Sequence, residues 1–164
     1  MAFTGFDPRD DLIASFTNDV DYDRDGNTEK CVQPTNDIGD TVNVPVLCVE
    51  ESRLGDIPYL PLVEVMLVAL PSHATNLGTR RFNDAIIDFN IYVQNDEHIT
   101  VKDFIQSIAN TIVNGITTYN RNSTFSNFLH AEIMGDGRLI LEEVGSNIVF
   151  HKVISVRAIR YDKS

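Results

Sequence analysis

Residues 80–94, RRFNDAIIDFNIYVQ, restrict the fold more than any other segment, because apolar and polar side chains alternate along them. The apolar positions are Ile87, Phe89, Ile91 and Val93, and the positions between them are Asp88, Asn90 and Tyr92. Successive side chains of a strand point to opposite faces, so this pattern predicts a half-buried antiparallel strand. A sheet built around such a strand needs a covering layer on its apolar face.

Residues 101–116, VKDFIQSIANTIVNGI, predict the helix that supplies this layer. Their apolar side chains recur at helical spacing, at Val101, Phe104, Ile105, Ile108, Ile112 and Ile116. Thr100 and Asp103 form a capping-box pattern at the start. Gly115 is less favourable than alanine in a helix interior by about 1 kcal/mol, so we expect the helix to end or bend there.

Further elements are predicted on either side of these two. A short helix begins with Asp7 as N-cap and Pro8 as first helical residue, and ends near Thr17. Residues 42–50 suggest a strand that Pro45 confines to an edge or a bulge. Residues 58–70 suggest a second strand, apolar on both faces near its end and therefore covered twice.

Toward the C-terminus, residues 128–134 and 138–144 read as a hairpin around the turn Gly135-Asp136-Gly137. Residues 148–162 predict a long final strand. The fold class expected is α+β: a single antiparallel (mixed) β-sheet with a short N-terminal helix and one longer amphipathic helix packed on one face. We expect one domain over 1–164, with a long acidic loop at about 18–42 that contains a short hairpin.

The net charge of −11 is spread unevenly. Residues 1–40 hold ten acidic and three basic residues, a net charge of −7. Such a chain gains little affinity for duplex DNA by neutralising phosphates. No apolar run approaches the roughly 18 residues that cross a bilayer, and no secretory signal precedes the first helix, so a soluble cytosolic product is expected. Cys31 and Cys48 are interpreted as free thiols.

Asp21-x-Asp23-x-Asp25-Gly26 matches the first half of a calcium-binding loop. Three carboxylates at alternate positions converge when a glycine allows the sharp turn. The bidentate glutamate that closes an EF-hand is replaced by Val32, and no second helix is predicted, so an EF-hand is not expected. Two interpretations stay open: a variant calcium site at Asp21, Asp23 and Asp25, and a solvated acidic turn.

Patterns typical of catalysis are not found in the sequence. His73, His98, His130 and His151 stand apart, without the spacing of a metal site, and no nucleophile elbow or phosphate-binding glycine loop occurs. We expect no enzyme and no cofactor besides the possible calcium. Arg80 and Arg81 follow a long interstrand loop and, with His73 and Asn76, are candidates for a subunit interface.

Four pieces in this order resemble the tail terminator and tail-completion proteins of tailed viruses, including the lambda-like minor tail proteins. They are PRDDLIASF at the N-terminus, the strand pair VEVMLVAL and RRFNDAIIDFNIYVQ, the helix VKDFIQSIANTIVNGI and the closing strand FHKVISVRAIRYD. The resemblance spans nearly the whole chain. The acidic segment 18–42 is longer than is usual for that family.

The resemblance implies a virion structural protein without catalytic residues. Its subunits would form a ring, usually a hexamer, at the head-proximal end of the tail, assembled in the host cytoplasm. That ring would terminate the tail tube, contact the tail tube protein and head-side connector proteins, and let DNA pass its lumen without specific binding. The alternatives are another neck or head–tail connector protein, a tail tube subunit, or a calcium-dependent binding module.

Overall fold

The computed structural model describes residues 8–21, 24–35, 39–48, 61–69, 72–74, 80–94, 101–122, 125, 130–137, 139–144 and 147–163. Two helices lie within these ranges, α1 (Pro8–Ala14) and α2 (Val101–Arg121). The strands there are β1 (Asn18–Val20), β2 (Glu29–Val32), β3 (Val44–Cys48), β4 (Leu62–Ala69), β5 (Ser72–Ala74), β6 (Arg80–Gln94), β7 (His130–Asp136), β8 (Ile140–Val144) and β9 (Asn147–Lys163).

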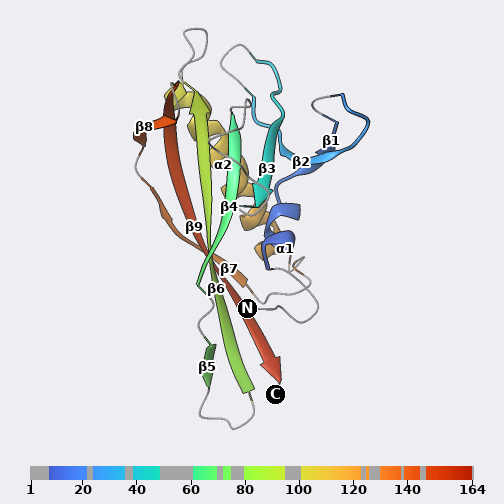
Figure 1. Ribbon diagram of the computed structural model, residues 1–164. Coiled ribbons are helices and arrows are strands. Elements are labelled where there is room, and N and C mark those ends of the chain that lie inside the picture. Colours follow the sequence, from blue (N-terminus) through green and yellow to red (C-terminus); the bar gives the residue numbers. More distant parts are fainter. Residues whose placement is uncertain are drawn as a thin grey trace.

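The described strands form one sheet in the order β1-β2-β3-β4-β6-β9-β7, with β5 added to β6 and β8 added to β9. All neighbours run antiparallel except β3 and β4, which are parallel. Figure 1 shows β6 and β9 as the two long central strands, paired from Arg80↔Lys163 to Gln94↔Val149. The expectation of an α+β fold with one mixed sheet is therefore confirmed.

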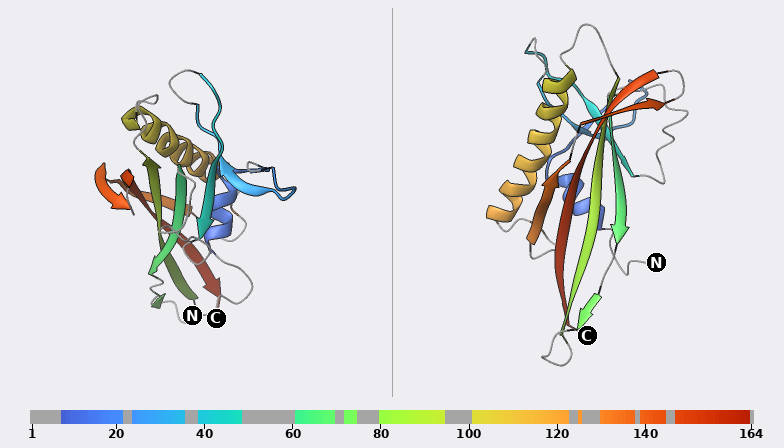
Figure 2. Two further views of the ribbon diagram at one scale, coloured as in Figure 1. Left: turned by 45° about the horizontal axis from the view of Figure 1, so that its top comes forward. Right: turned by 90° about the vertical axis from the view of Figure 1, so that its left-hand side faces the viewer.

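Both helices cover the same face of the sheet (Figure 2). From α2, the buried side chains are Val101, Phe104, Ile105, Ile108, Ala109, Ile112 and Ile116, which follow helical spacing. In β6, Ile87, Phe89 and Ile91 are fully buried on the face below them, as the alternation predicts. Phe16, after α1, packs edge-on against Phe89, with ring centroids 5.3 Å apart.

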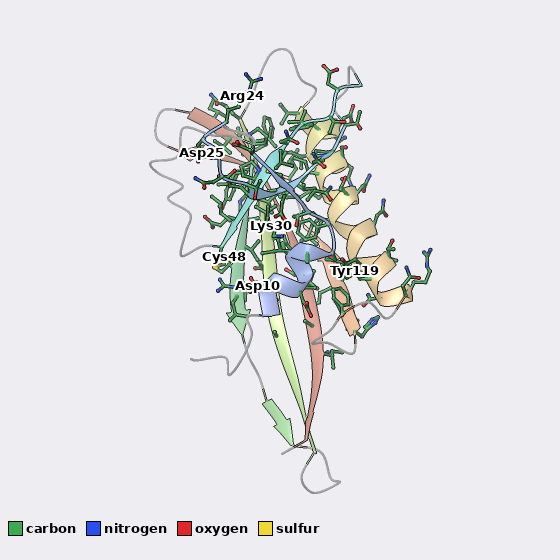
Figure 3. The ribbon with its side chains drawn as sticks, turned by 90° about the vertical axis from the view of Figure 1, so that its right-hand side faces the viewer. Asp10, Arg24, Asp25, Lys30, Cys48 and Tyr119 are labelled. Atoms are coloured by element: carbon green, nitrogen blue, oxygen red, sulfur yellow. The ribbon has the colours of Figure 1, made fainter. Side chains whose placement is uncertain are left out.

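Helix α2 runs through Gly115 to Arg121. The expectation that the helix ends at Gly115 is therefore wrong. A Cβ at Gly115 would lie 2.5 Å from the Ser15 carbonyl oxygen and 2.7 Å from Phe16 Cβ. The glycine thus allows a close approach of α2 to the residues that follow α1. Figure 3 shows Tyr119 beside α1, and its hydroxyl donates to the Ala14 carbonyl oxygen at 3.3 Å.

The predicted hairpin around Gly135-Asp136-Gly137 is not formed. Strands β7 and β8 do not pair with each other, because both pair in succession with the same side of β9. Gly137 donates its N–H to the Val153 carbonyl oxygen at 2.8 Å, which keeps the connection between β7 and β8 against β9. The Gly-Asp-Gly sequence therefore forms an irregular connection between two strands at the same edge of the sheet, rather than the turn of a hairpin. The hairpin in this region is β8–β9, paired from Val144↔Asn147.

Strands β3 and β4 differ from expectation in two respects. β3 lies between β2 and β4, so its assignment to an edge is wrong. Pro45 fits there because β3 changes neighbour at that point: Val44 and Pro45 pair with β2, and Val46 onward pairs with β4. In β4, the expected double cover near the strand end is also wrong, because Met66 is 37% and Val68 50% exposed.

The N-terminal expectations are largely met. α1 ends at Ala14, followed by a turn, and Leu12, Ile13 and Phe16 enter the core. The short hairpin expected within residues 18–42 is β1–β2, paired from Asn18↔Cys31 to Val20↔Glu29. Asp7 and Thr100, the predicted caps, lie outside the described residues.

Candidate interaction surfaces

The first candidate surface is a projecting ribbon that we call the arm: β5, residues 80–84 of β6 and residues 159–163 of β9. Residues 81–83 pair with β5 on one side and with β9 on the other, so β5 forms an outer boundary of the sheet. The arm continues past both helices, which lie over the other part of the sheet (Figures 1 and 2). Among the described residues, the arm therefore has no helix against it.

The arm contains most of the predicted interface residues. His73 lies in β5, while Arg80 and Arg81 begin β6; Asn76 falls outside the described residues. Residues 80–84 and 159–163 together hold four basic and two acidic residues, a net charge of +2 in a chain of −11. The arm thus has the opposite sign to the molecule as a whole.

The second candidate surface, which we call the β7–β8 edge, is residues 130–144 at the opposite boundary of the sheet. Its strands have one strand neighbour, β9. Large hydrophobic side chains are exposed along it: Met134, Leu139, Ile140 and Leu141, with Ile148 on the adjoining part of β9. Leu141 is 59% and Met134 53% exposed. Clustered apolar exposure of this kind is typical of an interaction surface.

One end of this edge is protected and the rest is not. At Ala131 the backbone N–H donates to Asn120 Oδ1 at 2.9 Å, and Asn120 Nδ2 donates to the Ala131 carbonyl oxygen at 2.5 Å. The side-chain amide of α2 thereby acts as a substitute strand neighbour for β7. Among the described strands, β8 has β9 as its one neighbour, so its other side is an edge to which a partner strand could add.

The third candidate is the acidic connection between β1 and β2, where Figure 3 labels Arg24 and Asp25 at the end of the molecule far from the arm. The Asp21 carboxylate accepts the N–H groups of Asp25 and Gly26, each at 3.0 Å. Arg24 has a φ of 59° and Gly26 a φ of 92°, both in the left-handed region. This turn is held by its own carboxylate.

The predicted calcium ligands are only partly brought together. Oxygens of Asp21, Asp25 and Glu29 lie within 4.8 Å of one another, while Asp23 is outside the described residues. Glu29 was not among the predicted ligands, although it occupies the ninth position of the loop, which supplies a ligand in EF-hands, often through water. Carboxylates are suitable ligands for a hard cation, but Asp21 already accepts two N–H groups and exposed acids often cluster without an ion.

Buried polar groups lie at the end of the central strands away from the arm. The His151 ring stacks on Tyr92, with centroids 4.3 Å apart, and its Nε2 lies 3.0 Å from Asn90 Oδ1. On the other face, Lys152 Nζ donates to Gln106 Oε1 of α2 at 3.1 Å. These contacts tie β6, β9 and α2 together. They give these buried polar groups partners inside the structure.

The remaining predictions concern cysteines, histidines and the membrane. Cys31 and Cys48 are not joined in a disulfide, as expected. Of the other histidines, His130 is exposed on β7, while His98 lies outside the described residues. Neither described helix combines the length and apolar character needed to cross a membrane.

No protein-family model matches the chain, and no curated protein matches it.

Proposed function

We propose that this protein is a virion structural protein of a tailed virus, a tail terminator whose subunits form a ring at the head-proximal end of the tail. The ring stops polymerisation of the tail tube and presents a surface to the head-side connector. Its role is structural rather than catalytic. The order of elements that resembles the terminator family is the starting point of the proposal.

The observation that carries the proposal is the presence of two unlike surfaces at opposite boundaries of one sheet. The arm is basic and lies past the helices, whereas the β7–β8 edge is apolar and has a strand neighbour on one side. A ring of identical subunits requires such a pair, because each contact joins one surface to a different surface of the next copy. Two copies of a single self-complementary surface would form a dimer instead.

The acidic character of the chain suits a ring through which DNA travels. Residues 1–40 carry a net charge of −7, and the β1–β2 hairpin within them presents exposed acids. Carboxylates near the opening would repel the phosphate backbone and prevent binding that stalls the genome. In this proposal the acidic end faces the lumen or the adjoining connector protein.

Electron microscopy of the purified protein in negative stain tests the proposal, together with its mass by light scattering over a range of concentrations. A terminator forms closed rings of uniform diameter. Open stacks would favour a tail tube subunit, and rings that bind head-side proteins but not tail tubes would favour a connector. A monomer at every concentration up to the solubility limit, with no binding to tail tubes, would contradict all three.

A calcium-dependent binding module is the alternative from another class. It has one observation in its favour, the approach of Asp21, Asp25 and Glu29 to within 4.8 Å. Calorimetric titration with calcium distinguishes the two functions, because the ring proposal requires no ion. Absence of heat at millimolar calcium would remove this alternative.

A further inference from the structure

Self-association through the β7–β8 edge is favoured first by its apolar character. Leu139, Ile140 and Leu141 are all at least 40% exposed, and Met134 and Ile148 extend the same area. Burying such side chains in a contact stabilises it by a free energy of roughly 25 cal/mol per Å² of apolar surface removed from water. The open backbone of β8 adds the possibility of strand pairing with a second chain, which fixes the register of the contact.

Electrostatics disfavour the simplest arrangement, in which two β7–β8 edges meet each other. Residues 130–144 hold four acidic residues and one basic residue, a net charge of −3. Among these, Glu132 lies exposed on β7. A symmetric dimer would place this charge against its own copy, and like charges facing one another across an interface are unfavourable. The partner surface should therefore be basic and able to supply a strand.

The arm meets both requirements. It carries a net charge of +2 over residues 80–84 and 159–163, and its outer strand β5 pairs with β6 on one side only. β5 lies on the side of β6 opposite to β9, whereas the β7–β8 edge lies on the far side of β9. The two surfaces therefore lie on opposite sides of the central β6–β9 pair, and copies placed side by side can bring one against the other.

We propose that the arm of one copy, through β5 and the start of β6, docks on the β7–β8 edge of a second copy of this chain. The apolar side chains supply most of the attraction, and the charges select this orientation over the symmetric one. The contact is head-to-tail, so it repeats from copy to copy and forms a ring where the rotation between copies closes. This inference rests on the proposed function, because it names the surfaces that join the subunits.

Charge reversal on either side tests the contact. Arg80→Glu/Arg81→Glu on the arm, or Glu142→Lys/Glu143→Lys on the edge, should weaken self-association roughly tenfold or more, measured as the dissociation constant by sedimentation. Combining all four substitutions should restore association, because opposite charges again face each other. A matched control, Lys102→Glu/Arg121→Glu on exposed positions of α2, changes the net charge by the same amount as the arm variant and should leave association unchanged.

Circular dichroism melting of each variant verifies that it folds, and the wild-type protein supplies a measurement independent of any substitution. Raising the salt concentration should weaken wild-type association, because salt screens exposed charge pairs. Wild-type assembly that neither salt nor reversal weakens, or a combined variant that is not restored, would overturn the arm-to-edge contact while leaving the ring standing. A wild-type protein that is monomeric throughout would overturn the contact and count against the ring.

Discussion

Gly115 is the residue at which α2 comes closest to the end of α1. A methyl group there would lie 2.5 Å from the Ser15 carbonyl oxygen, and the nearest atoms belong to backbone or to a buried aromatic side chain. Replacement by alanine improves helix propensity by about 1 kcal/mol but forces the two segments apart, which commonly costs about 1–3 kcal/mol. Because the two effects oppose each other, the measured change in stability shows which of them is larger at Gly115.

We predict that Gly115→Ala lowers the free energy of unfolding by about 1 kcal/mol, because an overpacking cost of about 2 kcal/mol outweighs the gain of about 1 kcal/mol in helix propensity. Urea denaturation followed by circular dichroism measures the change. Asn114→Ala is the control: Asn114 is exposed on the same helix, and this substitution should leave stability unchanged or slightly raised. Equal stability of the wild type and Gly115→Ala would show that α1 does not press on α2 at this point.

Asp21 determines the turn between β1 and β2, because its two carboxylate oxygens accept the N–H groups of Asp25 and Gly26. We predict that Asp21→Ala destabilises the protein by about 1 kcal/mol in the absence of calcium. Asp25→Ala removes the acceptor of the Asn27 N–H, which lies 2.8 Å from the Asp25 carboxylate, and should also destabilise the turn.

Thermal melting of these two variants and the wild type, each with and without calcium, separates a turn from a metal site. If the carboxylates only hold the turn, calcium leaves every melting temperature in place. A calcium-dependent rise in the wild type that both variants lose would support an ion at the cluster. Unchanged stability of Asp21→Ala without calcium would contradict the role of its carboxylate in the turn.

At the scale of elements, the joint between β7 and β8 keeps both strands paired with β9. Together they form one edge of the sheet along most of the length of β9. A Cβ at Gly137 would lie 2.5 Å from the Val153 carbonyl oxygen, whereas nothing lies within 4 Å of a Cβ at Gly135. We predict that Gly137→Ala destabilises the protein by about 1–3 kcal/mol, while Gly135→Ala is neutral or slightly stabilising. Urea denaturation of both variants provides the comparison, and similar values for the two would contradict this account of the joint.

The same region shows where sequence patterns are and are not sufficient. The alternation in residues 80–94 predicts β6 at its observed bounds, and helical spacing predicts the buried face of α2, because each pattern reports burial directly. The glycines at 135 and 137 permit either a turn or a close backbone approach. Which of the two occurs depends on β9, a distant segment, so local sequence favours the wrong alternative there.

At the scale of the whole molecule, both helices lie against one part of one sheet face, which leaves the arm and the β7–β8 edge at its boundaries (Figure 2). Composition indicates the charge of each surface but not its position. His73, Arg80 and Arg81 come to the arm because β5 folds back on β6. The hydrophobic residues at 139–141 are exposed at and just before β8, whose one neighbour among the described strands is β9. An apolar run in an edge strand has the same sequence pattern as a strand of the core, so the sequence does not predict that these residues are exposed.

The positions of the two surfaces predict which exposed hydrophobic residues contribute to self-association. Leu139→Ser/Leu141→Ser should weaken self-association, because these residues lie on the β7–β8 edge. They are 40% and 59% exposed, so the free energy of unfolding should change by no more than about 1 kcal/mol. Light scattering measures the association, and urea denaturation measures the stability.

The matched control is Met66→Ser/Val68→Ser on β4, where the side chains are 37% and 50% exposed. It removes a similar amount of exposed apolar surface outside the arm and the β7–β8 edge. Association should persist in this control, since the contact we propose runs from one boundary to the other. If the β4 variant weakens association and the β8 variant does not, subunits meet through the sheet face, and the ring must be built with that face between neighbouring copies.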